Sequence, residues 1–242
     1  MKITFTDSEQ AFYTLTASRI ADTIRQLPTA VIGLATGRTT TGVHEALCEL
    51  WRAQPFDTSR VTVFGMDEIT NVSRSFPGSC YDMLLRQVVR PLGIPMEHFL
   101  MPPTFSDDFA RECKAFEAAI AERGGVDLQI LGIGENGHLG FNQPGTPFDS
   151  TTWISRMDEK LDERIRRESG SSPDADLGGF TIGIKNIMMS RKIILAANGA
   201  NKAEIIFKAL RGKITPDIPA SVLQLHPFTE VILDPAAAAM LH

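Results

Sequence analysis

The chain has 242 residues, of which 43% are hydrophobic and 22% are charged, a composition that is ordinary for a globular protein with a large core. The formal net charge of −5 and the absence of a lysine- and arginine-rich run argue against nucleic acid or an anionic membrane as the main partner. No apolar run is long enough to cross a bilayer, and residues 1–8 do not resemble a signal peptide. The three cysteines, Cys48, Cys80 and Cys113, lack metal-site spacing and favour free thiols in a reducing cytoplasm.

Strands and helices are expected to alternate from the amino terminus. Residues 2–6 are predicted to form a strand, and Asp7 with Gln10 forms a capping pattern for the helix that follows. Residues 29–35 form an apolar run that is typical of a strand buried on both faces. This run leads into the segment TGRTTTG, residues 36–42, and then into a second helix.

The segment TGRTTTG combines a helix start with hydroxyl groups and an arginine. Unpaired N–H groups and the helix dipole both favour an anion at such a place. The candidate phosphate ligands are therefore Gly37, Arg38, Thr39 and Thr40. No Gly-Lys-Ser/Thr follows, so this is not a Walker loop, and a plain helix cap with surface threonines is the alternative.

A second buried strand, residues 61–66, ends at two acidic residues. Ligands bind at the carboxyl ends of strands in open parallel sheets. Asp67 is therefore a candidate general base and Glu68 a candidate substrate ligand, with a helix cap or an ion pair as the alternative. Further along, one helix is expected to stop before Pro91, and Ser106 is expected to cap the next.

Residues 127–133 are predicted to form a strand that leads into a glycine-rich stretch containing His138. Three glycines match the dinucleotide-binding pattern G-x-G-x-x-G: Gly132, Gly134 and Gly137. The sequence that follows is too broken for a helix, and Asp158 lies in a charged run rather than at a strand end, so no nicotinamide or flavin cofactor is expected. The glycines, Gly137 included, are expected to bring the backbone close to a small ligand and to aim His138 into a cleft.

Residues 156–179 are polar, show no strand pattern and are predicted to form a mobile lid. An arginine of this segment, Arg164, Arg166 or Arg167, could reach an anion. Strands are expected over residues 180–184 and 192–198, and the latter leads into a helix capped by Asn201.

Lys202 is expected in the first turn of the helix that Asn201 caps. A lysine there opposes the helix dipole, which suggests an anion between them; a solvated lysine is the alternative. The carboxyl ends of predicted strands are followed by each of the candidate site elements: the TGRTTTG segment, Asp67, His138 and Lys202.

The alternation indicates one α/β domain over residues 1–242, with a mainly parallel sheet, helices on both faces and a lid at residues 156–179. One crevice could hold all four chemical elements. A phosphate seat, a carboxylate and a histidine with no metal or cofactor pattern suggest proton transfer on a phosphorylated sugar.

Five segments spread over nearly the whole chain resemble the glucosamine-6-phosphate deaminase/isomerase family: LATGRTTTG, FGMDE, LGIGENGHLGFNQPGTPFDS, GANKA and IPASVLQLHP. Galactosamine-6-phosphate enzymes and, more distantly, 6-phosphogluconolactonases are related to this family. The resemblance implies a modified Rossmann-like sheet and the conversion of a 2-amino-2-deoxyhexose 6-phosphate to a ketose 6-phosphate plus ammonia, without a cofactor.

The resemblance also implies residue roles. Asp67 resembles the base that moves a proton from C2 towards C1, and His138 resembles the residue that opens the pyranose ring. Residues 37–41 and Lys202 resemble the phosphate-binding groups, and an arginine at or near Arg166 resembles a further one.

The chain departs from the family pattern beside His138. The deaminases usually have an aspartate two residues before this histidine and a glutamate five after it, where this chain has Asn136 and Gln143. Two amides should leave His138 less basic, with its tautomer set by hydrogen bonds alone. The resemblance leaves glucosamine and galactosamine substrates open, with a lactonase or a non-catalytic sugar-phosphate-binding protein as alternatives. A homo-oligomer is also left open.

Overall fold

The structure, a computed structural model, describes residues 1–157 and 159–241, so Asp158 lies outside the described residues. Seven parallel strands form a large sheet in the order β1-β10-β9-β6-β2-β3-β5, and three antiparallel strands form a small sheet in the order β4-β8-β7. The predicted α/β fold with a mainly parallel sheet is confirmed. Among the described residues, no helix is long and apolar enough to cross a membrane.

The strands are β1 (Lys2–Phe5), β2 (Val31–Leu34), β3 (Thr62–Gly65), β4 (Asp67–Thr70), β5 (Phe99–Leu100), β6 (Leu128–Leu131), β7 (Trp153–Arg156), β8 (Gly178–Thr181), β9 (Lys192–Ala197) and β10 (Thr229–Leu233). The α-helices are α1 (Glu9–Gln26), α2 (Arg38–Ala53), α3 (Cys80–Leu84), α4 (Arg90–Leu92), α5 (Phe109–Glu122), α6 (Glu159–Ser169), α7 (Ile184–Met188) and α8 (Ala203–Arg211). Shorter helical segments are the π-helical turn η1 (Leu85–Val89) and the 3₁₀ turns η2 (Met96–His98), η3 (Ala200–Lys202) and η4 (Pro219–Leu225).

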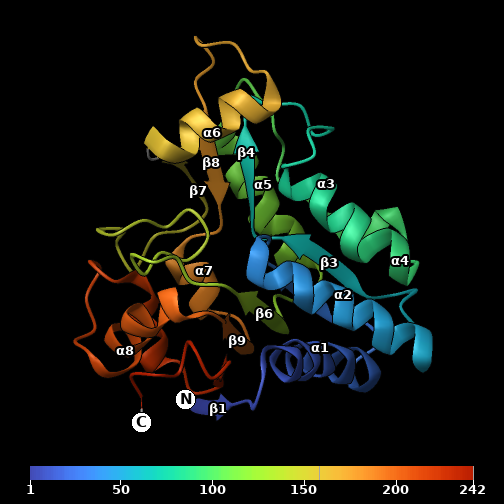
Figure 1. Ribbon diagram of the computed structural model, residues 1–242. Coiled ribbons are helices and arrows are strands. Elements are labelled where there is room, and N and C mark those ends of the chain that lie inside the picture. The colour runs from blue at the N-terminus through green and yellow to red at the C-terminus, as the bar shows by residue number, and fades with distance from the viewer. Residues whose placement is uncertain (158, 242) are drawn as a thin grey trace.

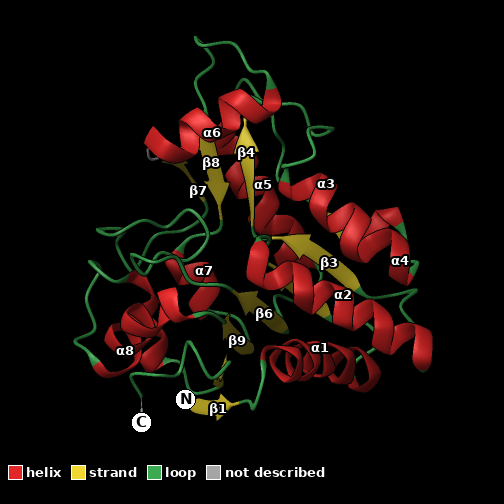
Figure 2. Ribbon diagram, viewed as in Figure 1, coloured by secondary structure: helices red, strands yellow, loops and turns green. Residues whose placement is uncertain are grey.

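Helices cover both faces of the large sheet, as expected from its strands. Along β9, Ile193 and Leu195 belong to one hydrophobic cluster, whereas Ile194 belongs to another, because successive side chains of a strand point to opposite faces. Helices α1, α2, α3 and α4 contribute to the cluster that contains Ile194, and α5, α7 and α8 contribute to the other. Figures 1 and 2 show α1 and α2 side by side near the large sheet.

The predicted boundaries of α1, α5 and the helix that contains Pro91 are wrong. The hydroxyl of Ser8, rather than Asp7, accepts the capping hydrogen bond of α1. Asp108 caps α5 by accepting from the N–H of Arg111 at 3.0 Å, whereas Ser106 accepts from the N–H of Asp108. In each case the capping side chain lies one or two residues closer to the helix, a shift that a capping pattern alone does not resolve.

The third boundary concerns Pro91, where the helix continues to Leu92 instead of stopping. A proline removes the N–H that would bind the carbonyl four residues earlier, which here belongs to Gln87. Gln87 lies in the π-helical turn η1, and its carbonyl accepts instead from the thiol of Cys48 at 3.1 Å. The widened turn and the thiol together accommodate the proline.

The candidate lid is more ordered than its sequence pattern indicates. Its described residues contain helix α6 and end in the first residues of β8, and the preceding strand, β7, was not predicted. Ile165 of α6 is buried in a small hydrophobic cluster with Ile69 and Leu177. Leu161, one turn earlier, packs against the same cluster, so these two apolar residues form the buried face of a helix that is otherwise polar in sequence. In Figure 1, α6 and the small sheet stand above the large sheet.

Strand β8 begins and ends earlier than expected. It runs over two glycines and stops at Thr181, and Ile184 instead begins α7. Glycine is a poor strand former, but a Cβ on Gly179 would lie 2.4 Å from the ring of Phe141. Close packing of the aromatic ring therefore explains why a glycine stands in this strand.

The two sheets meet at a single residue, Met66, which separates β3 from β4. The N–H of Met66 donates to the carbonyl of Leu34 at the end of β2, at 3.2 Å. The carbonyl of Met66 accepts from the N–H of Ile182, just after β8, at 2.9 Å. The next residue, Asp67, pairs with Thr181 as the first residue of β4.

Candidate active site

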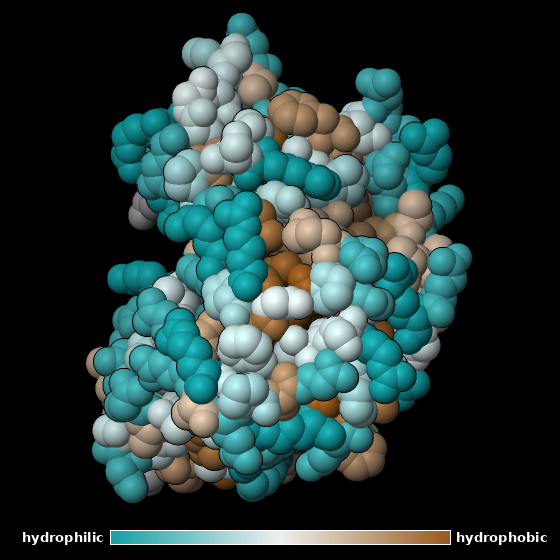
Figure 3. All heavy atoms as spheres, turned by 90° about the vertical axis from the view of Figure 1, so that its right-hand side faces the viewer, coloured by the Kyte–Doolittle hydropathy of each residue, from teal (hydrophilic) through white to brown (hydrophobic). Residues whose placement is uncertain are grey.

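A cavity of about 950 Å³ lies at the carboxyl ends of β2, β3, β6 and β9. Eight of the sequence-predicted site residues line it: Gly37, Arg38, Thr39, Thr40, Asp67, Asn136, His138 and Lys202. Gln143, Glu68, Gly137 and Arg166 do not belong to its lining residues. Segments far apart in the sequence are thus brought together at one edge of the large sheet. On the side of the molecule shown in Figure 3, hydrophilic residues cover most of the surface and hydrophobic atoms are visible in a hollow near its centre.

The TGRTTTG segment forms the first turn of α2 rather than a loop before it, because the helix begins at Arg38. Gly37 precedes the helix with φ of 137°, a conformation that favours glycine. The hydroxyls of Thr40 and Thr41 both donate to the carbonyl of Gly37, and the hydroxyl of Thr39 donates to Asn198 at 2.6 Å. The threonines therefore hold this turn in shape, and the first-turn N–H groups of α2, which lack intrahelical acceptors, are the suitable anion donors.

Two cationic side chains, Arg38 and Lys202, line the same part of the cavity. Burial lowers the pKa of Lys202, and the charge of Arg38 lowers it further, whereas Glu135 raises it. Asn201 does not cap α8; its amide donates to Glu135 at 2.6 Å. Two like charges held close together at a helix start make a site where a doubly charged phosphate would be stabilised.

Asp67 lies where the large and small sheets join, partly exposed to the cavity. Burial raises the pKa of its carboxyl to about 7, and the nearby charge of Glu68 raises it as well, while a hydrogen bond from Cys80 lowers it. A carboxylate whose pKa lies near neutrality can accept a proton and give it back under physiological conditions.

Glu68 points away from the cavity, as expected for the neighbour of Asp67 in a strand. Its side chain is fully buried and accepts hydrogen bonds from the N–H groups of Ile69, Cys80 and Tyr81 at 2.8, 3.0 and 2.7 Å. Glu68 therefore stabilises the start of α3 through hydrogen bonds, whereas its place at the predicted strand end led us to expect a substrate contact.

His138 belongs to a chain of side chains with two amides. Its Nδ1 lies 2.8 Å from Oδ1 of Asn136, and the same oxygen accepts from the backbone N–H of His138 at 3.2 Å. Oε1 of Gln143 accepts from Nδ2 of Asn136 at 3.0 Å. Gln143 thus acts on the histidine through Asn136 rather than by lining the cavity.

Two glycines allow the His138 loop to approach its surroundings. A Cβ on Gly134 would lie 2.2 Å from the imidazole, so the ring packs directly over this glycine. Gly140 has φ of 57°, and a Cβ there would lie 3.2 Å from Oδ2 of Asp67. Gly137, which was expected to contact a ligand, packs instead against Ile218. Gly134 therefore makes room for the imidazole, and Gly140 lets the same loop pass close to the carboxylate of Asp67.

The candidate lid supplies an arginine to the cavity, and it is Arg164. Leu161, one helical turn earlier on α6, lines the cavity as well. Arg166 pairs with Asp162 and donates to the carbonyls of Ser172, Pro173 and Ala175. Arg166 thus holds the loop after α6, and Arg164 replaces it as the arginine available to an anion.

The polar lining residues that sequence reasoning missed include Glu9, Tyr13, Cys80 and Asn198. Asn198 follows the carboxyl end of β9 and donates to both Glu9 and Tyr13, at 2.8 and 3.1 Å. Its position at a strand end was a usable signal, whereas Tyr13 and Cys80 come from helices with no motif. Within residues 1–157 and 159–241, no cluster of three or more histidine, cysteine or acidic side chains could hold a metal ion.

The chain is an α/β protein with an open, mainly parallel sheet, whose cavity brings two cations at a helix start together with a carboxylate and a histidine. The chain belongs to the glucosamine-6-phosphate isomerase/6-phosphogluconolactonase family, whose sequence profile matches residues 6–232. The glucosamine-6-phosphate deaminase of Clostridium acetobutylicum is 39% identical over 241 residues, covering 100% of both chains. That of Clostridium botulinum strain Kyoto is 38% identical over 242 residues, covering 100% of this chain and 99% of the other.

Solved structures agree with this assignment. A monomeric glucosamine-6-phosphate deaminase superposes with a TM-score of 0.92 at 33% identity, covering 99% of this chain and 100% of that one. A 6-phosphogluconolactonase from Trypanosoma brucei superposes with a TM-score of 0.79 at 18% identity, covering 100% of this chain and 98% of that one. The second likeness concerns the fold alone.

Proposed function

We propose that this protein converts glucosamine 6-phosphate and water into a ketose 6-phosphate and ammonia. The observation that carries the proposal is that Asp67, whose pKa is raised to about 7, lines one cavity with His138 and with the Arg38 and Lys202 cations. The relatives at 36–39% identity, all named glucosamine-6-phosphate deaminase, favour this sugar over galactosamine 6-phosphate.

The residues have the following proposed roles. The first turn of α2, Lys202 and Arg164 bind the phosphate and fix the sugar in place. His138 donates a proton to the ring oxygen as the C1–O5 bond breaks, and the anomeric hydroxyl loses its proton to solvent, so that C1 becomes an aldehyde. The C2 proton is then acidic because it lies next to a carbonyl.

Asp67 removes the C2 proton and delivers it to C1. The electron pair released at C2 forms the C1–C2 double bond of the enolamine while the aldehyde oxygen takes up a proton. Protonation at C1, with loss of a proton from the nitrogen, then leaves a C2 imine. Water adds to this imine and ammonia leaves, giving the ketose 6-phosphate. The protein supplies proton transfer and orientation, which the cavity groups can provide without a metal or an organic cofactor.

Two alternative activities are separated by a direct assay. Purified protein is incubated with glucosamine 6-phosphate, galactosamine 6-phosphate or 6-phosphogluconolactone, and ammonia or acid release is followed. Ammonia release from glucosamine 6-phosphate supports the proposal, and a preference for galactosamine 6-phosphate would change the sugar. Acid release from the lactone alone would make the protein a hydrolase. Stabilisation by a sugar phosphate without any reaction would indicate a binding protein.

The three cysteines favour a reducing compartment such as the cytoplasm. Cys48, Cys80 and Cys113 are all free and buried. Free thiols persist where glutathione and thioredoxin keep them reduced. We therefore infer a cytoplasmic metabolic role, which fractionation of the source cells would test.

A further inference from the structure

A buried thiol lies beside the proposed base. Cys80 is 6% exposed, and its Sγ lies 3.5 Å from Oδ1 of Asp67. The hydroxyl of Thr36 donates to the same sulfur at 3.1 Å. Hydroxyl, thiol and carboxylate therefore form a chain in which each group donates to the next.

The thiol in this chain is a donor rather than a nucleophile. Burial raises the pKa of Cys80 well above its ordinary value, and the charges of Asp67 and Glu68 raise it further, while the bond from Thr36 lowers it. A thiol in such surroundings stays protonated and unreactive at neutral pH. Its hydrogen is consequently available to Asp67.

The position of Cys80 is fixed from its backbone as well. Its N–H donates to the buried carboxylate of Glu68 at 3.0 Å, at the start of α3. Thr36 lies two residues after the end of β2 and immediately before Gly37 of the candidate phosphate site. The sulfur thus joins the segment that would bind phosphate to the carboxylate that would move the proton.

The two oxygens of Asp67 have different surroundings. Oδ1 faces the thiol, whereas Oδ2 lies near the Gly140 turn of the His138 loop, at 3.2 Å from the place where a Cβ would stand. A carboxylate held through one oxygen cannot rotate freely, so the other oxygen keeps one direction.

We propose that Cys80 is a positioning residue for the reaction, whose thiol holds Oδ1 of Asp67 and thereby presents Oδ2 to the C2 proton of the substrate. Thr36 sets the orientation of the thiol. This inference rests on the proposed role of Asp67 as the base.

The inference has a consequence for pH dependence. The titratable groups acting on Asp67 are Cys80 from α3 and Glu68 from its own strand, while Thr181 of β8 and Gly140 carry no charge. His138, from the loop after β6, lines the same cavity. A donor to a carboxylate stabilises its ionised form, so removing the thiol should raise the pKa of Asp67.

The test compares Cys80→Ala, which removes the donor, with Cys80→Ser, which keeps one. For Cys80→Ala we expect kcat at pH 7 to fall about fivefold, with KM changed less than about twofold, and the acidic limb of kcat/KM to move to higher pH. In Cys80→Ser, the acidic limb of kcat/KM should stay near that of the unaltered protein. If the pH profiles of kcat/KM are the same in both variants, whether shifted or not, packing rather than hydrogen-bond donation matters, and the proposal is overturned.

A readout independent of turnover separates this proposal from the proposed function. The Asp67 carboxyl is titrated by carbon-13 NMR in both variants, with Asp67→Asn identifying its signal. A higher pKa in Cys80→Ala, restored in Cys80→Ser, supports the contact even if no hexosamine phosphate reacts. An unchanged pKa in a folded Cys80→Ala protein overturns it even if the enzyme is active.

Discussion

Gln143 accepts a hydrogen bond from the amide nitrogen of Asn136 at 3.0 Å, and this contact turns the Asn136 oxygen towards Nδ1 of His138. An amide oxygen can only accept, so the network assigns the hydrogen to Nδ1 and makes Nε2 the ring atom suited to proton exchange. A carboxylate at position 136 could also accept from Nδ1 and would add negative charge, but it has no N–H to donate to residue 143. The two amides therefore orient His138 without the negative charge that a carboxylate would add.

Restoring one carboxylate should raise activity. In Gln143→Glu the new oxygen still accepts from Asn136, and its charge stabilises protonated His138, so deamination of glucosamine 6-phosphate should rise about three- to tenfold. Gln143→Ala is the matched control, because it removes the acceptor and should lower the rate. Steady-state ammonia release measures both, and an unchanged rate in Gln143→Glu would mean that the glutamine is a neutral replacement.

Removing the proposed base should abolish turnover and spare binding. Asp67→Asn cannot accept the C2 proton, so kcat should fall by about 10²- to 10⁴-fold. The phosphate groups are untouched, so the rise in melting temperature caused by a sugar phosphate should persist. In the unaltered protein, kcat/KM should fall as the pH drops below about 7, because the carboxyl becomes protonated. Full activity of Asp67→Asn would remove this residue from the mechanism.

The raised pKa of Asp67 also predicts an effect on stability. The folded protein binds this proton up to about pH 7, whereas the ordinary carboxyl loses it near 3.8, so stability declines as the pH rises through this window. Asp67→Asn carries no charge and should melt higher than the unaltered protein at pH 8, by about 3 °C, with a smaller difference at pH 5. Thermal denaturation at the two pH values checks this, and an equal difference at both would contradict the linkage.

Lys202 should contribute to phosphate affinity more than to chemistry. Lys202→Ala removes one of the two cations beside the start of α2, and binding of inorganic phosphate should weaken about tenfold or more. KM should rise while kcat changes little. Lys208→Ala is a suitable control, because that lysine lies further along α8 and pairs with Glu204. Calorimetry measures the phosphate affinity of both variants. Equal affinities of Lys202→Ala and Lys208→Ala would argue against a phosphate site at the start of α2.

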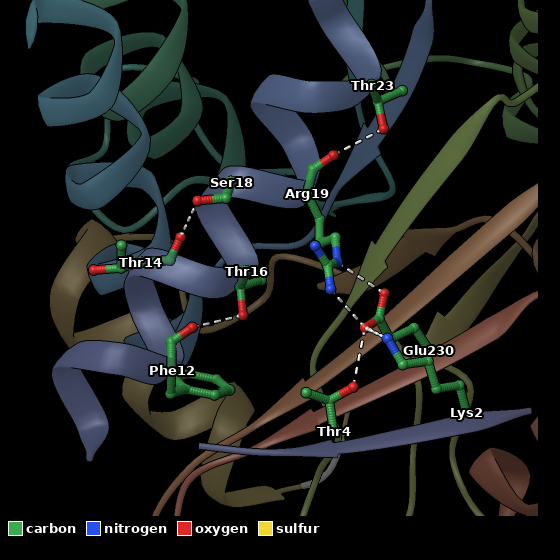
Figure 4. Close-up of polar contacts among 9 residues, drawn as sticks. All are labelled: Lys2, Thr4, Phe12, Thr14, Thr16, Ser18, Arg19, Thr23 and Glu230. Carbon is green, nitrogen blue, oxygen red and sulfur yellow. Dashed lines mark hydrogen bonds and ion pairs between the residues drawn. The ribbon is translucent and has the colours of Figure 1, made fainter. Parts of the chain in front are cut away.

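A second carboxylate, Glu230, is expected to act on stability alone. Its side chain is 7% exposed and accepts from Lys2, Thr4 and both Nε and Nη2 of Arg19, as Figure 4 shows. Burial raises the pKa of Glu230, but the bonds from Arg19, Lys2 and Thr4 outweigh burial and lower it to about 2. The stabilisation is therefore present above the ordinary value of 4.5 and is lost as the pH falls towards 2.

Glu230→Gln should cost about 2 kcal/mol at pH 7, because it leaves Arg19 with a weakened partner. The difference in melting temperature between Glu230→Gln and the unaltered protein should be smaller at pH 3 than at pH 7. Asp22→Asn, at an exposed pair with Arg25, should change little at either pH. A gap that stays constant from pH 7 to pH 3 would show that the charge of Glu230 is not the cause.

The sequence predicts the large sheet well, because its strands are apolar runs that end in glycine, threonine or acidic residues. The candidate site follows largely from strand ends, and Asp67, His138 and Lys202 do line one cavity. Asp67 and Glu68 were predicted to follow a strand, whereas they begin the unpredicted strand β4, in which neighbouring side chains point to opposite faces.

The remaining site residues depend on contacts that local sequence does not encode. Choosing Arg164 over Arg166 requires the phase of α6, which Leu161 and Ile165 define, whereas the polar run of residues 156–179 was predicted as a lid without a helix. Cys80 reaches Asp67 only because the intervening segment folds back through Glu68. Such contacts are properties of the packed chain rather than of a motif.

The chain passes from the large sheet to the small one at Met66, one residue before Asp67. Met66 is hydrogen-bonded to the end of β2 in the large sheet and to Ile182, just after β8 of the small sheet. Asp67 is therefore held beside both sheets at once, and its carboxylate needs no movement of either sheet to face the cavity. A substitution that shifts the packing of either sheet would consequently displace this carboxylate, even where the altered residue lies far from the cavity.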